Sequence, residues 1–229
     1  MNFFKKYKNK YFIETGSYTG KGIEKAIEAG FENIISIEIT PTYYELCKEK
    51  FKDYSNVEII LGDSVKVLPE ILKDIKVPCT FWLDAHYVDK STEYGDNFCS
   101  IMHELEIIKE HEITTHSILI NDMRCWDESN FFYKHYLFNN DDIKNKIKEI
   151  NPNYTFSFED GYIENDVLVA ETNIEIVKVV KEIKPVVEDI EEIKSVVEEV
   201  KEIKPIKKEV KSKNKSKKTT TKNVKNKRK

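Results

Sequence analysis

The chain has 229 residues, 40% of them hydrophobic and 34% charged, enough for one packed domain with a segment left over. No apolar stretch approaches the roughly 18–20 residues that a membrane helix needs, and the N-terminal segment lacks the apolar region of a signal peptide. We therefore expect a soluble, cytoplasmic protein that does not engage a membrane.

The aromatic residues and glycines indicate where the packed body ends. All of them lie at or before Tyr162, so residues 173–229 cannot build a core of their own. That segment carries 18 basic and 10 acidic residues, a net charge of +8, which leaves −12 on the rest because the whole chain is −4. An acidic body repels phosphate backbones and argues against nucleic acid bound broadly by the globular part. The sequence predicts a domain within 1–172, packed from about residue 8, followed by an appendage.

The appendage divides into a repeat and a basic tail. Residues 173–205 repeat EIK at ten-residue intervals and are predicted to be a charged linker. Val and Ile recur every three or four residues there, which favours a helix, whereas Pro185 and Pro205 would break one. Residues 206–229 hold 12 basic residues and one Glu and are predicted to be a disordered basic tail. The alternative is a tether to nucleic acid, an acidic partner or a membrane surface.

Short apolar runs alternate with segments of helical periodicity along the body, which predicts a parallel sheet covered on both faces. The last two strands are joined only by the polar turn DGYIEN, too short for a helical crossover, so they should pair antiparallel. The expected fold class is α/β, with a Rossmann-like, doubly wound, mostly parallel seven-stranded sheet and an antiparallel terminal hairpin. Strands are predicted at 11–15, 33–38, 57–61, 79–84, 117–121, 154–159 and 166–170, and helices at 19–29, 41–53, 64–74, 99–112 and 139–150.

The cysteines and histidines form no metal-binding pattern. The four cysteines have no CxxC spacing, and their wide separation predicts buried thiols in a reducing compartment. His103 is followed by Glu104, but no second histidine stands at the HExxH spacing of a zinc helix. We expect His103, His111 and His116 on helix or loop surfaces.

The most informative motif is ETGSYTGKG at residues 14–22, between an apolar run and a helix-like segment. Its glycines let the backbone approach a ligand too closely for any side chain. The next strand ends at Glu38, whose carboxylate can accept hydrogen bonds from both ribose hydroxyls of a nucleoside. Together these features predict a nucleoside cofactor.

Two classes of nucleoside-binding enzyme fit this loop. TGSYTGKG matches the TGxxxGxG pattern of short-chain NAD(P) dehydrogenases, which need a catalytic Tyr-xxx-Lys on the helix after the fifth strand. Here the only Tyr-xxx-Lys, Tyr44 to Lys48, lies on the helix after the second strand, and no Asn-Asn-Ala-Gly follows the fourth. The dehydrogenase interpretation is therefore disfavoured.

ETGSYTG resembles motif I of class I S-adenosylmethionine (SAM) methyltransferases, in the variant with an aromatic residue at its centre. The chain is most similar to catechol O-methyltransferase and related small-molecule O-methyltransferases. The likeness continues through SIEITPTYYELCKEKF, LGDSVKVLPEIL, FWLDAHY and SILINDM, in the family's order and spacing, and covers about residues 11–172. It implies an enzyme that moves the SAM methyl group to an oxygen of a small-molecule acceptor by direct displacement.

The resemblance also implies which residues hold the cofactor. A sulfonium cation is favoured by the carboxylates of these motifs, whereas a pyrophosphate would be repelled. The implied set places Gly16 and Gly20 at the methionine portion, Tyr18 at the wall beside it, Glu38 at the ribose, and Asp63, Ser64 and Ile39 at the adenine, with Glu14 and Asp84 completing the cofactor residues.

Asp84 ends the fourth strand and Asn121-Asp122 ends the fifth, at the edge where doubly wound folds bind ligands. In the catechol-type enzymes these strand ends bind Mg²⁺ with the acceptor hydroxyl, so the resemblance implies a metal site of Asp84, Asn121 and Asp122. The chain departs from the family in the reversed order of the Asn-Asp pair and in Tyr87, where a lysine is expected. His86 is the candidate general base, with Asp84 as the other catalytic residue, and the alternative for His86 is a plain polar loop residue.

Residues 88–98 and the aromatic segment 126–138 are candidates for the acceptor pocket, the alternative for the latter being a helix packed on the sheet. Only about ten residues precede the first strand, so the site is expected to be open or to be completed by a second subunit in a homodimer. Two other functions are kept: an RNA or protein methyltransferase served by the basic tail, and a catalytically inactive SAM-fold module whose tail is an interaction arm.

Overall fold

The computed structural model describes residues 2–85, 99–126 and 138–172. Predictions for the appendage lie outside these ranges. Seven strands are present in the described part of the chain. They are β1 (Tyr11–Thr15), β2 (Asn33–Glu38), β3 (Val57–Leu61), β4 (Cys79–Leu83), β5 (Ser117–Ile120), β6 (Tyr154–Glu159) and β7 (Val167–Thr172).

The seven strands form one sheet in the order β3-β2-β1-β4-β5-β7-β6. β1 to β5 pair in parallel, whereas β7 pairs antiparallel with both β5 and β6. The predicted α/β fold and its terminal hairpin are therefore confirmed. The carboxyl ends of the five parallel strands lie along one edge of the sheet, which is where the predicted site residues fall.

All five predicted helices form; the first and the last end where predicted, and the other three end two or three residues earlier. They are α1 (Lys21–Ala29), α2 (Pro41–Lys50), α3 (Ser64–Leu72), α4 (Ile101–Glu110) and α6 (Asn140–Ile150), with short 3₁₀ helices η1 (Phe3–Tyr7) and η2 (Met123–Trp126).

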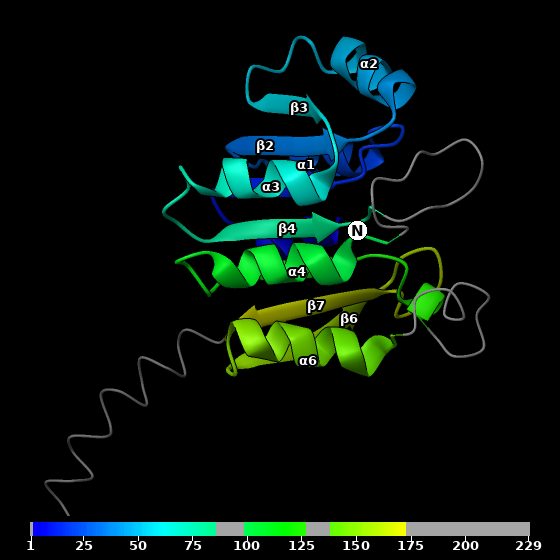
Figure 1. Ribbon diagram of the computed structural model, residues 1–229. Coiled ribbons are helices and arrows are strands. Elements are labelled where there is room, and N and C mark those ends of the chain that lie inside the picture. The colour runs from blue at the N-terminus through cyan, green and yellow to red at the C-terminus, as the bar shows by residue number, and fades with distance from the viewer. Residues whose placement is uncertain (1, 86–98, 127–137, 173–229) are drawn as a thin grey trace, which may run out of the picture. The chain divides into compact units, whose positions relative to one another are not determined.

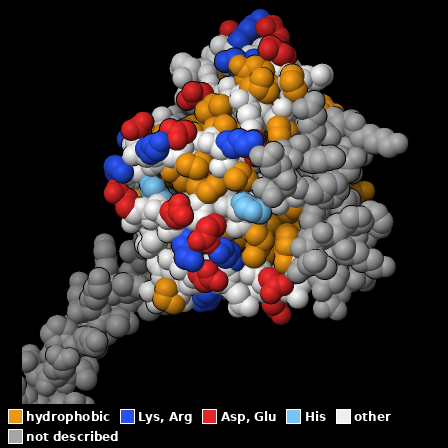
Figure 2. Space-filling model, in the orientation of Figure 1, with side chains coloured by type: hydrophobic (Ala, Val, Ile, Leu, Met, Phe, Trp, Pro, Cys, Tyr) orange, Lys and Arg blue, Asp and Glu red, His pale blue; other side chains and the backbone are white. Residues whose placement is uncertain are grey.

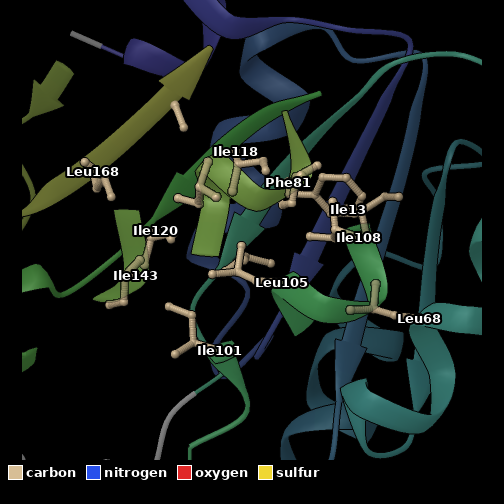
Figure 3. Close-up of a cluster of buried hydrophobic side chains, with 14 of the residues drawn as sticks. Ile13, Leu68, Phe81, Ile101, Leu105, Ile108, Ile118, Ile120, Ile143 and Leu168 are labelled. Carbon is tan, nitrogen blue, oxygen red and sulfur yellow. The ribbon is translucent and has the colours of Figure 1, made fainter. Parts of the chain in front are cut away.

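The helices cover both faces of the sheet. Figure 1 shows α3, α4 and α6 in front of it and α1 behind. Because successive side chains of a strand point to opposite faces, Ile13 packs in the cluster with the front helices and Phe12 in the cluster with α1 and η1. In the close-up of Figure 3, Phe81 and Ile118 from the sheet lie against Leu105 of α4. Burial on both faces explains why the central strands read as continuous apolar runs.

The N-terminal segment is part of the core, which corrects the expected start of packing near residue 8. Phe3, Phe4 and Tyr7 of η1 are buried, and the Phe4 ring lies 5.0 Å from both Phe12 and Trp82. Two phenylalanines bury enough apolar area to hold a single helical turn against the sheet.

All four cysteines are buried and unpaired with one another, as predicted. The prediction for His116 was wrong, because this residue is only 1% exposed, just ahead of β5. Its Nδ1 accepts the Cys79 backbone N–H (3.0 Å), and its Nε2 lies 3.1 Å from Nδ1 of His111. Burial, with a further contribution from His111, lowers the pKa of His116 to about 4. The histidine is therefore a neutral structural element of the core.

The helical face carries charges of both signs. Figure 2 shows acidic and basic side chains interspersed there, around apolar side chains that gather over α3. Lys109 of α4 pairs with Glu149 of α6 (2.8 Å), and Lys146 pairs with Glu106 in the opposite direction. This face therefore presents no extended field of one sign. No described helix combines the length and apolar character needed to cross a membrane.

Candidate functional site

Backbone hydrogen bonds beyond the strand ends bring the predicted residues together. Gly16 N–H donates to Ile37 O (2.8 Å), and Asp84 N–H donates to Thr15 O (3.1 Å). Asn121 N–H in turn donates to the last residue of β4 (3.1 Å). The glycine-rich turn, the end of β4 and the end of β5 are thus neighbours along one edge, as parallel pairing requires.

Gly16 is required by the close approach of two strand ends. Its backbone is left-handed (φ 85°), and a Cβ there would lie 2.9 Å from Asp84 O and 3.2 Å from Ala85 Cα. Only glycine fits this conformation and this space at once. The turn after β1 therefore passes directly against the end of β4.

Glu38 faces the glycine-rich turn, in the position that the predicted ribose contact needs. It is 5% exposed, and its Oε2 and Oε1 accept the backbone N–H groups of Tyr18 (2.7 Å) and Thr40 (2.8 Å). Tyr18 reaches this contact through a left-handed backbone (φ 44°). A carboxylate has about four lone-pair positions, so Glu38 can accept further donors while it holds the turn. The ribose contact itself stays a prediction.

Glu14 lies inside the protein beneath the turn. It is 1% exposed and accepts a hydrogen bond from Ser36 Oγ (2.5 Å), which is itself bonded to Ser17 Oγ (2.6 Å). Burial raises the pKa of Glu14 to about 8 against the opposing Ser36 hydrogen bond, and the charges of Asp84 and Glu38 raise it further. Glu14 is thus largely a neutral acid at pH 7, so it supplies less negative charge than its type suggests.

The residues predicted beside the adenine separate into two groups. Asp63 caps α3 by accepting the Val65 N–H (3.1 Å), and it and Ile39 are partly exposed. Ser64 is buried, and its Oγ donates to Glu104 Oε1 (2.5 Å) inside the protein. The Ser64 side chain is therefore committed to the interior, and only its backbone faces the α3 terminus.

At the methionine end, Tyr18 is half exposed and its ring lies 4.5 Å from that of Tyr43 on α2. Gly20 precedes α1 with a left-handed backbone (φ 79°), and a Cβ there would come within 2.5 Å of the Phe51 ring. Packing of the protein on itself thus accounts for Gly20, whereas Tyr18 offers an aromatic surface to solvent.

The residues of the predicted magnesium site have other partners in this structure, and the metal site itself stays a prediction. Asn121 Nδ2 donates to Asp84 Oδ1 (2.9 Å), but Asp122 pairs with Arg124 (2.6 Å), which also pairs with Asp166. The left-handed backbone of Asp122 (φ 58°) turns this residue toward η2. Arg124 lies between the carboxylates of Asp122 and Asp166 and supplies the positive charge that a bound metal ion would otherwise supply there. Within the described ranges, no cluster of three His, Cys, Asp or Glu could bind a metal ion.

The candidate base His86, Tyr87 and the predicted acceptor segment 88–98 lie outside the described residues, as do residues 127–137. Of the aromatic segment, Trp126 and Phe138 are described, and their rings stack 5.3 Å apart.

Glu104 is a buried residue that the sequence analysis left without a role. It lies on α4 between Ile101, Leu105 and Ile108, all buried, and is itself 1% exposed. Burial raises the pKa of Glu104 to about 7, although hydroxyl hydrogen bonds act in the opposite direction. A carboxyl in the apolar stripe of an amphipathic helix is the sequence signal that could have identified it.

Comparisons with known proteins identify the fold of the chain. No protein-family model and no curated protein matches the chain. Among solved structures, the chain is similar to SMU.1697c of Streptococcus mutans, described as a methyltransferase and solved in complex with SAH. The identity is 14% and the TM-score 0.52, over 74% of this chain and 93% of that protein.

The chain is also similar to spermidine synthase of Thermotoga maritima, at 11% identity and a TM-score of 0.51. That match covers 76% of this chain and 57% of the synthase. At such identities the similarity is one of fold, and it agrees with the predicted architecture. Chemistry must be argued from the residues at the edge of the sheet.

Proposed function

We propose that the chain is a SAM-dependent methyltransferase whose cofactor lies along the carboxyl edge of β1, β2 and β4. The observation that carries the proposal is the pairing of Glu38 with the glycine-rich turn. A buried carboxylate with remaining acceptor capacity lies 2.7 Å from the Tyr18 N–H, next to the turn that Gly16 allows. This arrangement suits a ribose diol, which donates two hydrogen bonds to one carboxylate.

The charge of the edge favours SAM over a dinucleotide. Glu38 ends β2, and Asp63 and Asp84 follow β3 and β4. The charges of Asp84 and Glu38 already raise the pKa of buried Glu14. Such a field attracts a sulfonium cation and repels a pyrophosphate. The bound cofactor would supply an electrophilic methyl group, and the chain's residues would bind it, orient it and exclude water.

We further propose an oxygen of a small molecule as the acceptor, on the strength of the motif resemblance alone. Asp84 and Asn121 lie at the ends of β4 and β5, with Asn121 Nδ2 2.9 Å from Asp84 Oδ1, and they would orient the acceptor by hydrogen bonding. His86 remains the proposed general base. The interspersed charges of the helical face give no support to an RNA substrate bound there (Figure 2).

The appendage supports a separate, weaker proposal, because its net charge of +8 would attract an acidic partner or nucleic acid to the −12 body. If the acceptor is RNA or protein, removing residues 173–229 should lower its turnover while leaving SAM affinity unchanged. A small-molecule acceptor should be methylated equally by both forms. A cytoplasmic location and either a monomer or a homodimer accompany the main proposal.

Titration calorimetry with SAM and with S-adenosylhomocysteine tests the cofactor assignment. Glu38→Gln should weaken both ligands about tenfold or more, because it removes a charged acceptor worth ~1.5–3 kcal/mol per hydrogen bond. Glu58→Gln, an exposed glutamate on neighbouring β3, is the matched control and should bind as the wild type does. Equal affinity of the Glu38 and Glu58 variants, or binding of NAD⁺ in preference to SAM, would rule the proposal out.

A further inference from the structure

Glu104 joins three separate segments of the chain beneath the proposed cofactor site. Its carboxyl contacts hydroxyls from three elements: Ser64 Oγ of α3 (2.5 Å), Ser100 Oγ ahead of α4 (2.8 Å) and Thr15 Oγ1 of β1 (3.3 Å). Glu104 is 1% exposed and also lines, with Leu83, a crevice between β4, β5 and α4. A buried carboxyl group needs hydrogen-bond partners, and these three hydroxyls supply them.

These hydroxyls connect Glu104 to predicted site residues or to their chain neighbours. Thr15 precedes Gly16, and its Oγ1 accepts a hydrogen bond from the backbone N–H of Asp84 (3.3 Å). Ser64 follows Asp63, the cap of α3. Ser100 reaches the far side of the site, because its Oγ lies 2.8 Å from the carbonyl oxygen of Ala85.

The number of hydrogens that Ser100 and Glu104 carry determines which of the two donates to the other. Ser100 Oγ has one hydrogen but two neighbours at 2.8 Å, Ala85 O and Glu104 Oε1. Ala85 O can only accept, so the Ser100 hydrogen belongs there. The contact between Ser100 and Glu104 then needs a hydrogen from the carboxyl group. A carboxylate would leave two acceptors competing for a single hydrogen.

We propose that Glu104 is a positioning residue of the carboxyl edge, held as a neutral acid whose proton completes a chain from Ser64 through Ser100 to Ala85. The chain fixes the separation between the α3 terminus and the end of β4, which are the adenine and transfer ends of the proposed cofactor site. This inference rests on the proposed function for its consequence in binding, but the protonation of Glu104 does not depend on it.

Loss of the proton should loosen this edge. A carboxylate at Glu104 cannot donate to Ser100, and it faces the charge of Asp63, which already raises its pKa. Cys99, ahead of α4, is a further ionisable group that interacts with Glu104, and it interacts in turn with Cys125 in η2. Asp84 connects to Glu104 through Thr15 Oγ1, which contacts both residues. Burial raises the pKa of both thiols to 11 or above, so they stay neutral.

Infrared difference spectroscopy of wild type against Glu104→Gln tests the protonation without any ligand. At pH 6 the wild type should show the carbonyl stretch of a protonated carboxylic acid that the variant lacks. The band of Glu14 cancels in the difference spectrum, because both proteins keep that residue. Glu110→Gln, exposed on the same helix, should remove no such band. Absence of the band from the wild-type minus Glu104→Gln spectrum would overturn the proposal, whatever the protein binds.

The affinity for S-adenosylhomocysteine tests the positioning role. In Glu104→Gln the amide N–H group, placed where Oε1 stands, keeps a donor for Ser100 but offers no acceptor to Ser64, because both hydroxyls contact that one oxygen. Glutamine does not ionise, so the affinity of the variant should not change with pH. The ratio of wild-type to variant affinity should fall about tenfold from pH 6 to pH 8, as the protonated fraction falls. A constant ratio would refute positioning by the proton, and an infrared band without ligand binding by either protein would refute the proposed function instead. Thermal unfolding of the variant near the wild-type temperature confirms that its fold is intact.

Discussion

Replacing Gly22 with alanine should destabilise the protein, although the same change in most helices is stabilising. Gly22 lies in the first turn of α1, where alanine is worth ~0.5–1 kcal/mol over glycine. Here a Cβ would overlap Glu14 Oε1 and lie 3.4 Å from Trp82 Cδ1. Glu14 cannot move aside easily, because it is buried and bonded to Ser36. Overpacking costs ~1–3 kcal/mol, and this severe overlap with a buried group belongs in the upper part of that range, ~2–3 kcal/mol. Subtracting the gain of ~1 kcal/mol from alanine leaves a net loss of about 1–2 kcal/mol.

Thermal and urea unfolding measure the effect. For a domain of this size the midpoint temperature should fall by about 2–8 °C. In a Glu14→Ala background the obstruction is gone, so Gly22→Ala should become stabilising by ~0.5–1 kcal/mol. Lys21→Ala, exposed and adjacent, is the control and should change little. A Gly22→Ala protein as stable as the wild type would contradict the packing of Glu14 beneath α1.

Three further predictions concern pH, metal and the appendage. The pKa of His116 is about 4 in the folded protein against 6.5 when unfolded, so its stabilising effect is full above pH 6.5 and is lost as pH falls through 4. The free energy of unfolding should fall by about 3 kcal/mol over that range. Urea unfolding of the wild type and of His116→Asn at each pH measures this loss. An equally steep loss of stability in His116→Asn would show that another group causes the acid sensitivity. Titration with MgCl₂ should release no saturable heat, because Arg124 already pairs with Asp122. Saturable heat that is lost in Asp84→Asn would show instead that the strand ends bind Mg²⁺. A chain ending at Thr172 should unfold at the full-length temperature and keep its SAM affinity, and aggregation would instead make the appendage structural.

The order of strands and helices was readable from the sequence because burial imposes different periods on the two kinds of element. Apolar runs such as Cys79–Leu83 are buried on both faces, and each is followed by an amphipathic segment. Helix ends were less predictable, since the last turn is decided by local hydrogen bonds. η1 was missed because a single turn has too few residues to show a period.

The candidate site was predictable where it depends on strand ends and not where it depends on distant partners. Gly16 and Glu38 face each other because parallel strands bring their carboxyl ends together. The pairing of Asp122 with Arg124 was not predictable, because Arg124 is also held by Asp166, which directly precedes β7. No local pattern encodes a contact over that separation. The burial of His116 follows likewise from packing between β4 and α4.

The carboxyl edge defines one direct test of the central claim. A crystal structure with S-adenosylhomocysteine should place the two ribose hydroxyls within hydrogen-bonding distance of Glu38, with the amino acid portion against the Gly16 turn. The purine should lie between Ile39 and Asp63. A nucleoside bound elsewhere, or an edge that stays empty at saturating ligand, would contradict the account.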